Sequence, residues 1–172
     1  MNFVQHSINW VRGEGLEMVL ISAAGIVLIA SGIGFWKLGA TPLAKAMLWP
    51  LVVIGLAYAA IGISGYVSNQ RRIPEFERAY RGDAPAFISA EKTRVEGFQY
   101  MYKITNVVAP VCFALATGLF WFTLNAHARA VGMALVIFGV LGFLIDSFSK
   151  ERADIYYAKI LEASASSRPT QQ

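Results

Sequence analysis

Ionisable side chains that could do chemistry within a membrane are scarce in this chain, and they stand at the ends of its apolar stretches. Glu17 and Asp146 are the two acidic candidates, and Lys150 follows Asp146 by about one helical turn. A proton- or ion-coupled carrier needs such groups deep in its bundle. We therefore expect Asp146, Lys150 and Lys103 to form an interfacial ion pair or to contact lipid headgroups.

The patterns of enzymes and metal centres are missing as well. The sequence has two histidines, His6 and His127, which are expected on opposite sides of the membrane, and one cysteine, Cys112. A haem site between helices needs facing histidines, and a thiol oxidoreductase needs paired cysteines. The sequence therefore predicts a protein that is not an enzyme, with no catalytic residues, no cofactor and no metal site.

Four long apolar stretches must position these few groups, at residues 17–36, 43–67, 104–124 and 130–148. About 20 helical residues span the ~30 Å hydrocarbon core of a bilayer, and backbone polar groups there must bond within the helix. The composition agrees, since 56% of the residues are hydrophobic and 15% are charged. The sequence predicts an all-α integral membrane protein, a four-span helical bundle.

The basic residues predict its orientation. Lys37, Lys45 and Arg129 fall in the loops after the first and third stretches, and the other twelve of the 15 Lys and Arg residues fall on the opposite side. All eleven acidic residues lie on that side too. The positive-inside rule then places both termini in the cytoplasm. Compact size and short outer loops favour the bacterial inner membrane.

The segments outside the stretches carry helical stripes of apolar residues. We expect an interfacial helix before a hinge at residues 13–15, with Trp10 as its membrane anchor. In the cytoplasmic segment 68–103, Pro74 suits a first helical turn and Ser89 an N-cap. An amphipathic helix is expected at 150–163, completing a single membrane domain over 1–163, and a disordered tail at 164–172.

The second pair of stretches resembles the first at a constant offset in numbering, which predicts a tandem repeat of two helical hairpins. Ala30 aligns with Ala114 and Gly34 with Gly118. Small residues at helix-contact spacing let helix backbones approach, either within the chain or in a homo-oligomer. The predicted helix-packing residues are Ala30, Gly34, Gly55, Ala59, Ala114 and Gly118.

The cytoplasmic side mixes charge with aromatic residues. Segment 68–103 has seven basic and five acidic residues, a net charge too small to favour nucleic-acid binding. Two uses remain open: seating on anionic headgroups of the lipid bilayer, or docking another membrane or cytoplasmic protein. The predicted surface consists of Arg71, Arg72, Phe76, Arg78, Tyr80, Phe98, Tyr102, Tyr156 and Tyr157.

These observations favour a non-catalytic integral membrane protein that acts as an accessory, regulatory or immunity-type subunit through protein–protein interaction. The alternative is a small homo-oligomeric channel or carrier for an uncharged solute. That alternative needs several polar span residues, such as Ser22, Ser64 and Thr117, on one face toward a symmetry axis.

Overall fold

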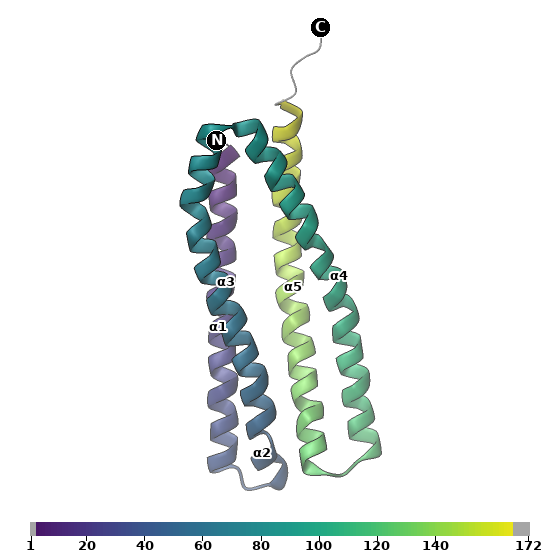
Figure 1. Cartoon of the computed structure of the whole chain (residues 1–172). Helices are drawn as coiled ribbons and strands as arrows, with labels where there is room; N and C mark the ends of the chain where they lie inside the picture. Colours follow the sequence, from purple (N-terminus) through teal and green to yellow (C-terminus); the bar gives the residue numbers. More distant parts are fainter. Residues whose placement is uncertain (1–2, 167–172) are drawn as a thin grey trace.

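The computed structural model describes residues 3–166, with the side chains of all of them except residues 100 and 101. Nearly all of these residues are helical. α1 spans Phe3–Leu38, and the short α2 spans Pro42–Ala46 before α3 at Leu48–Gly82. α4 spans Ala84–Phe122 and α5 spans Ala126–Ser166. Figure 1 shows the four long helices side by side, with both termini at one end and the two hairpin loops at the other. We call these the terminal end and the loop end.

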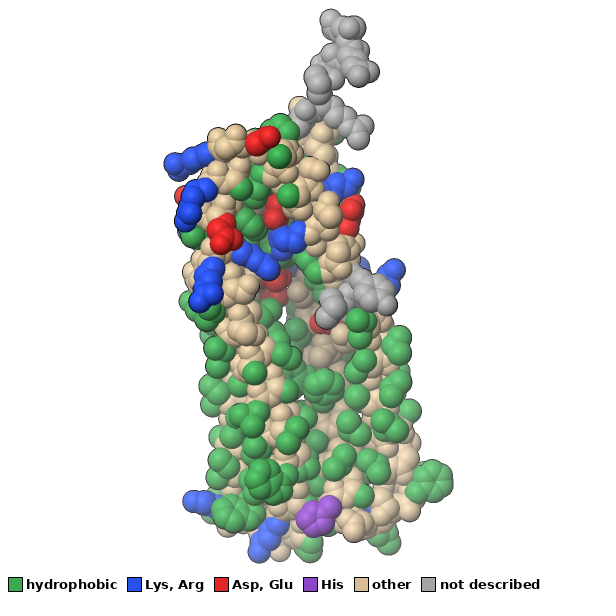
Figure 2. Space-filling view, viewed as in Figure 1, with side chains coloured by type: hydrophobic (Ala, Val, Ile, Leu, Met, Phe, Trp, Pro, Cys, Tyr) green, Lys and Arg blue, Asp and Glu red, His purple; other side chains and the backbone are tan. Residues whose placement is uncertain are grey.

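The four long helices are long and apolar enough to span a membrane, counting α2 and α3 together. Each buries only part of its apolar surface, and large side chains such as Leu20, Val53, Val107 and Leu144 point outward. Figure 2 shows a mostly hydrophobic lower surface and charged side chains gathered near the terminal end. An exposed apolar surface of this extent is typical of a protein surrounded by lipid.

The helices run further than the sequence pattern predicts, and four expectations about them are wrong. Residues 164–166, expected in a disordered tail, are the last residues of α5, and the rest of that tail lies outside the described residues. α1 passes through residues 13–15 without a hinge, and the guanidinium of Arg152 occupies the place where a side chain at Gly13 would be. Pro74 lies inside α3. Because proline has no N–H, the Gln70 carbonyl loses its hydrogen bond within the helix, but Gln70 is exposed and water can reach it. α4 begins at Ala84 and not near Ser89, because Asp83 caps it by accepting from the Ala86 N–H at 3.0 Å.

Glycine contacts hold α1 against α3. A Cβ atom placed on Gly55 would lie 2.7 Å from the Gly25 carbonyl oxygen, and one on Gly25 would lie 2.5 Å from the Gly55 oxygen. Nearer the loop end, a Cβ on Gly32 would lie 3.1 Å from the Leu48 oxygen. The two backbones therefore approach too closely to admit any side chain at Gly25 or Gly55.

The contacts between α4 and α5 fall at the equivalent positions of the second hairpin. A Cβ on Gly139 would lie 3.5 Å from the Ala109 oxygen, and this pair corresponds to Gly55 and Gly25 of the first hairpin. A Cβ on Gly132 would lie 3.5 Å from the Ala116 oxygen, and this pair corresponds to Leu48 and Gly32. This second hairpin is looser, because the rings of Phe113 and Phe120 lie beside the glycines.

The predicted packing residues divide into two groups. Gly55 and Ala59 are buried in the contact between α1 and α3. Ala30 and Ala114 are exposed, and a Cβ on Gly34 or Gly118 would meet nothing within 4 Å. The constant offset therefore pairs Ala30 and Gly34 with residues that also lie outside the helix contacts, whereas Gly25 and Gly32 make the contacts on α1.

Candidate functional site

The extensions of the four long helices pack together at the terminal end into a compact unit, which we call the head (residues 3–16, 68–103 and 149–163). Its buried core takes side chains from each long helix: Phe3, Trp10, Val11, Phe76, Phe87, Ile88, Val95, Tyr156 and Ile160. Trp10 lies between two rings, stacked on Tyr156 at 4.9 Å and on Phe98 at 5.8 Å between centroids. The expectation that Trp10 anchors in lipid is therefore wrong, since the residue is buried in the protein and only 7% exposed.

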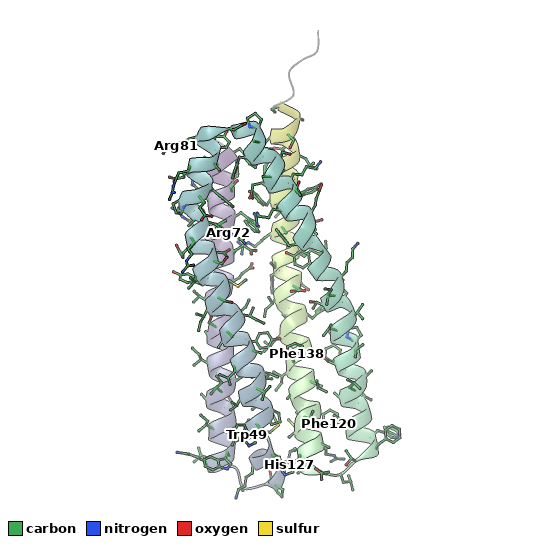
Figure 3. The ribbon with its side chains drawn as sticks, viewed as in Figure 1. Trp49, Arg72, Arg81, Phe120, His127 and Phe138 are labelled. Atoms are coloured by element: carbon green, nitrogen blue, oxygen red, sulfur yellow. The ribbon has the colours of Figure 1, made fainter. Side chains whose placement is uncertain are left out.

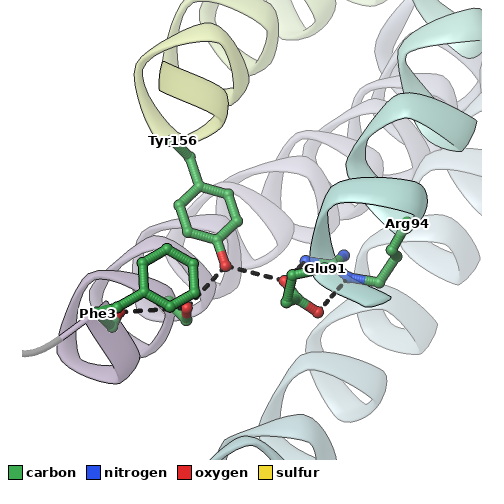
Figure 4. Close-up of polar contacts among 5 residues, drawn as sticks. Phe3, Glu91, Arg94 and Tyr156 are labelled. Atoms are coloured by element: carbon green, nitrogen blue, oxygen red, sulfur yellow. Dashed lines mark hydrogen bonds and ion pairs between the residues drawn. The ribbon is translucent and has the colours of Figure 1, made fainter. Parts of the chain in front are cut away.

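A buried carboxylate lies at the centre of the head. Glu91 is 4% exposed, and Arg94 donates two hydrogen bonds to it at 2.9 and 2.6 Å. The Tyr156 hydroxyl donates to the same carboxylate at 2.9 Å and lies 2.8 Å from the Ser7 hydroxyl (Figure 4). Burial, followed by the charge of Glu91, raises the pKa of Tyr156, so this hydroxyl stays a donor. The network links α1, α4 and α5 through paired polar groups.

Arg94 also contacts the aromatic core. Its guanidinium carbon lies 4.9 Å from the ring centroid of Trp10, 5.6 Å from that of Phe98 and 5.7 Å from that of Phe76. A guanidinium within about 6 Å of a ring face is attracted by the ring's negative face, and more strongly when water is excluded. Arg94 is thus held by both Glu91 and the rings.

Below this core is a polar cavity of about 350 Å³, lined by Trp10, Glu14, Arg72, Arg94, Phe98, Tyr102 and Ser149. The hydroxyls of Tyr102 and Ser149 lie 3.3 Å apart, and Ser149 donates to Glu14 at 3.4 Å. Burial, and next the charge of Glu17, raise the pKa of Glu14. These groups donate and accept hydrogen bonds, so the arrangement is suited to binding a polar group.

An ion pair joins the first and last helices at the base of the head. Arg152 of α5 pairs with Glu17 of α1 and donates a second hydrogen bond to the Trp10 carbonyl at 3.3 Å. Gly13 provides the space in which this guanidinium lies. The second oxygen of Glu17 is buried and has no hydrogen-bond partner among the described residues.

The nine residues predicted to form one interaction surface have four different placements. Phe76 and Tyr156 are buried in the core, so they support the head from inside and do not face a partner. Arg72, Phe98 and Tyr102 meet around the polar cavity. Tyr80 packs against the core, and the Tyr157 hydroxyl donates to Glu96 at 2.6 Å. Arg71 and Arg78 are exposed on α3.

The three residues expected at the interfacial ion pair are placed differently. Lys150 pairs with Asp154 on its own helix at 2.7 Å, and both side chains are about half exposed. Asp146 is half-buried and Lys103 is exposed, and neither forms an ion pair with any described residue. The interfacial ion pair across helices is instead made by Glu17 and Arg152.

Sequence reasoning missed Glu14, Glu91, Arg94, Ser149 and the role of Trp10. One signal was present, since Glu91 and Arg94 have the i, i+3 spacing of a helical ion pair. Their burial depends on packing between four helices, which the spacing does not reveal.

Within the described part of the chain, no group of three or more His, Cys, Asp or Glu side chains is placed to hold a metal ion. Comparison with protein-family models, with curated proteins and with solved structures finds no match. The function must therefore be argued from the geometry of the head and of the spans.

Proposed function

We propose that this protein is a non-catalytic integral membrane subunit that binds another protein through its head. The four apolar helices would lie in the bacterial inner membrane, with both termini and the head in the cytoplasm, as the distribution of Lys and Arg favours. The subunit would be of an accessory, regulatory or immunity type, because its role is to present a surface.

One observation carries this proposal: a row of charged side chains on the outer face of α3 has no partner within the described residues. Arg71, Arg78 and Arg81 are exposed, and Glu75 and Glu77 are exposed between them. None of the five forms an ion pair inside the described chain, whereas Lys92, Lys150 and Lys159 all do. Unpaired charges of both signs on a rigid helix suit a complementary protein surface.

The rigidity of that helix has a structural cause. Phe76 lies on the opposite side of the same α3 segment and packs against Phe87 at 5.3 Å between ring centroids. It is 7% exposed and belongs to the core of the head. A prepared, fixed surface loses less entropy on binding than a mobile one.

The internal repeat supports a related proposal, that the two hairpins arose by tandem duplication. Two backbone contacts, Gly25 with Gly55 and Gly32 with Leu48, recur at the equivalent positions of the second hairpin. The pore alternative gains no comparable support, because Ser64 and Thr117 each donate to a carbonyl of their own helix.

The test is photocrosslinking in the native host membrane. A photoreactive residue replaces Arg78 in the head or, as a control, Leu56, an exposed residue of the span. A crosslink from Arg78 alone to one defined polypeptide would support the proposal. Native mass spectrometry of the protein extracted with mild detergent would then give the stoichiometry.

Charge reversal separates protein binding from lipid seating. The R71E/R78E variant should lose the crosslinked polypeptide, and reversal of Lys103, an exposed cation of α4, should not. If position 78 crosslinks to lipid alone, the proposal is wrong and the row of charges seats the head on the membrane. A pure homo-oligomer would instead favour the channel or carrier.

A further inference from the structure

A large opening lies between the two hairpins near the loop end, far from the head. Its volume is about 670 Å³, and its apolar walls come from α2, α3, α4 and α5. Figure 3 shows Trp49 and Phe138 on the two sides of this opening, with His127 at the loop end. A volume of roughly 300–1,000 Å³ with mainly apolar walls is usual for a small-molecule site.

The cavity ends where the two hairpins meet. Tyr58 of α3 donates a hydrogen bond to the Phe138 carbonyl of α5 at 2.9 Å, and the two rings lie 5.6 Å apart. Phe138 and Ala57 both line the cavity, so this contact closes it on the side of the head. The residues that line the groove run from Lys45 to Ala57 on one side and from His127 to Phe138 on the other.

The mouth of the groove is cationic. Lys45 and His127 line it together with Trp49. Lys45 is exposed and forms no ion pair with the residues that the structure describes. No Asp or Glu is among the residues that line the groove, and the sequence has none between residues 18 and 74 or between 97 and 145. A ligand for this site has an anionic end and a long apolar body.

We propose that the groove binds one anionic phospholipid, with an acyl chain between the hairpins and the phosphate group at Lys45. His127 adds a hydrogen-bond donor to the same mouth, and Trp49 sits at the depth where aromatic rings meet headgroups. Acyl-chain contact fills space that the two hairpins leave open. This inference rests on the proposed membrane placement and is independent of any partner of the head.

Native mass spectrometry of the full chain tests it directly. The protein in mild detergent is exposed to equal amounts of phosphatidylglycerol and phosphatidylcholine of different mass. One retained phosphatidylglycerol is expected. The K45Q variant should lower that preference about fivefold, since a basic residue beside anionic headgroups contributes roughly that factor. Its control is K37Q, an exposed lysine of the same end that does not line the groove.

A second pair of variants tests the acyl chain. Ala57 is exposed and lines the groove, so A57F would fill it and should abolish lipid retention. Ala60 is exposed on the same helix outside the groove, and A60F should retain the lipid. Equal retention of the two lipids, or retention that A57F leaves unchanged, overturns the proposal.

A photoreactive residue in place of Trp49 distinguishes the remaining occupants. Crosslinking to phospholipid supports the proposal, whereas crosslinking to a second copy or to another polypeptide overturns it. Loss of the head's partner in R71E/R78E leaves this result unaffected, so failure of one proposal can be told from failure of the other.

Discussion

The hydroxyl of Tyr156 donates a hydrogen bond to the buried carboxylate of Glu91 at 2.9 Å, joining α5 to α4. The same carboxylate holds Arg94, whose guanidinium stacks over the Trp10 ring. Residues from three helices thus depend on one carboxyl group. A buried carboxylate is stable only while its partners remain, and this makes the network sensitive to single atoms.

Removal of the Tyr156 hydroxyl should destabilise the head. We expect Y156F to lower the free energy of unfolding by about 1–2 kcal/mol, because Glu91 loses a buried donor. Thermal unfolding in detergent, followed by circular dichroism, should show a midpoint lower by several degrees. The matched control is Y157F, whose hydroxyl bonds the exposed Glu96, and this change should leave the unfolding midpoint nearly unaltered. Equal effects of the two variants would contradict the assigned network.

The α1–α3 contact should not tolerate a side chain at Gly55. A Cβ there would lie 2.7 Å from the Gly25 carbonyl oxygen, so G55A must push the two backbones apart. We expect a loss of about 1–3 kcal/mol, measured by thermal unfolding in detergent. Gly34 is the control because a Cβ there meets nothing within 4 Å. G34A should keep or raise stability, by up to about 1 kcal/mol.

Glu14 should make the head more stable in acid. Its pKa is raised by burial and next by Glu17, with Arg152, Ser149 and Arg94 acting in the opposite sense. The folded state therefore holds the proton more tightly than the unfolded chain. The contribution is complete below the ordinary carboxyl pKa of 4.5 and is lost as the pH rises through the raised folded pKa.

The variant E14Q removes this dependence. At pH 7–8 it should unfold at a higher temperature than the natural protein, because no charge has to be buried. Near pH 4 the two proteins should unfold at the same temperature. A natural protein that is the more stable of the two at pH 8 would show that Glu14 is held as a favourable charge, by Arg152 above all.

Hydropathy sufficed to predict the four long helices, because about 20 apolar residues in a row have few other stable structures. The head was harder to predict for a physical reason. The stripe that includes Val11 and Trp10 shows that this helix has an apolar face. Either a lipid surface or a protein core could cover such a face, so the pattern does not tell the two apart. The choice depends on Tyr156 of the last helix, which stacks on Trp10 of the first.

The same reason explains the packing residues. Small-residue spacing marked Gly55 and Ala59, which lie in the α1–α3 contact, and equally marked Gly34 and Gly118, which lie in open surroundings. Spacing places residues on one helix face without showing which face a neighbouring helix covers. The constant offset between the hairpins was more informative, since it relates Gly25 and Gly55 to Ala109 and Gly139, which also meet.

The ion pair of Arg152 with Glu17 should be coupled more strongly than an exposed pair. The side chains are 32% and 16% exposed, and Arg152 also donates to the Trp10 carbonyl. A double-mutant cycle with R152A, E17A and both together should give a coupling energy of about 1–2 kcal/mol from thermal unfolding in detergent. The control cycle uses Lys150 and Asp154, whose side chains are 56% and 50% exposed. That exposed pair should give less than about 0.5 kcal/mol, because solvent screens its charges. If the two coupling energies are equal, Arg152 stabilises the head through packing at Gly13 rather than through the charge of Glu17.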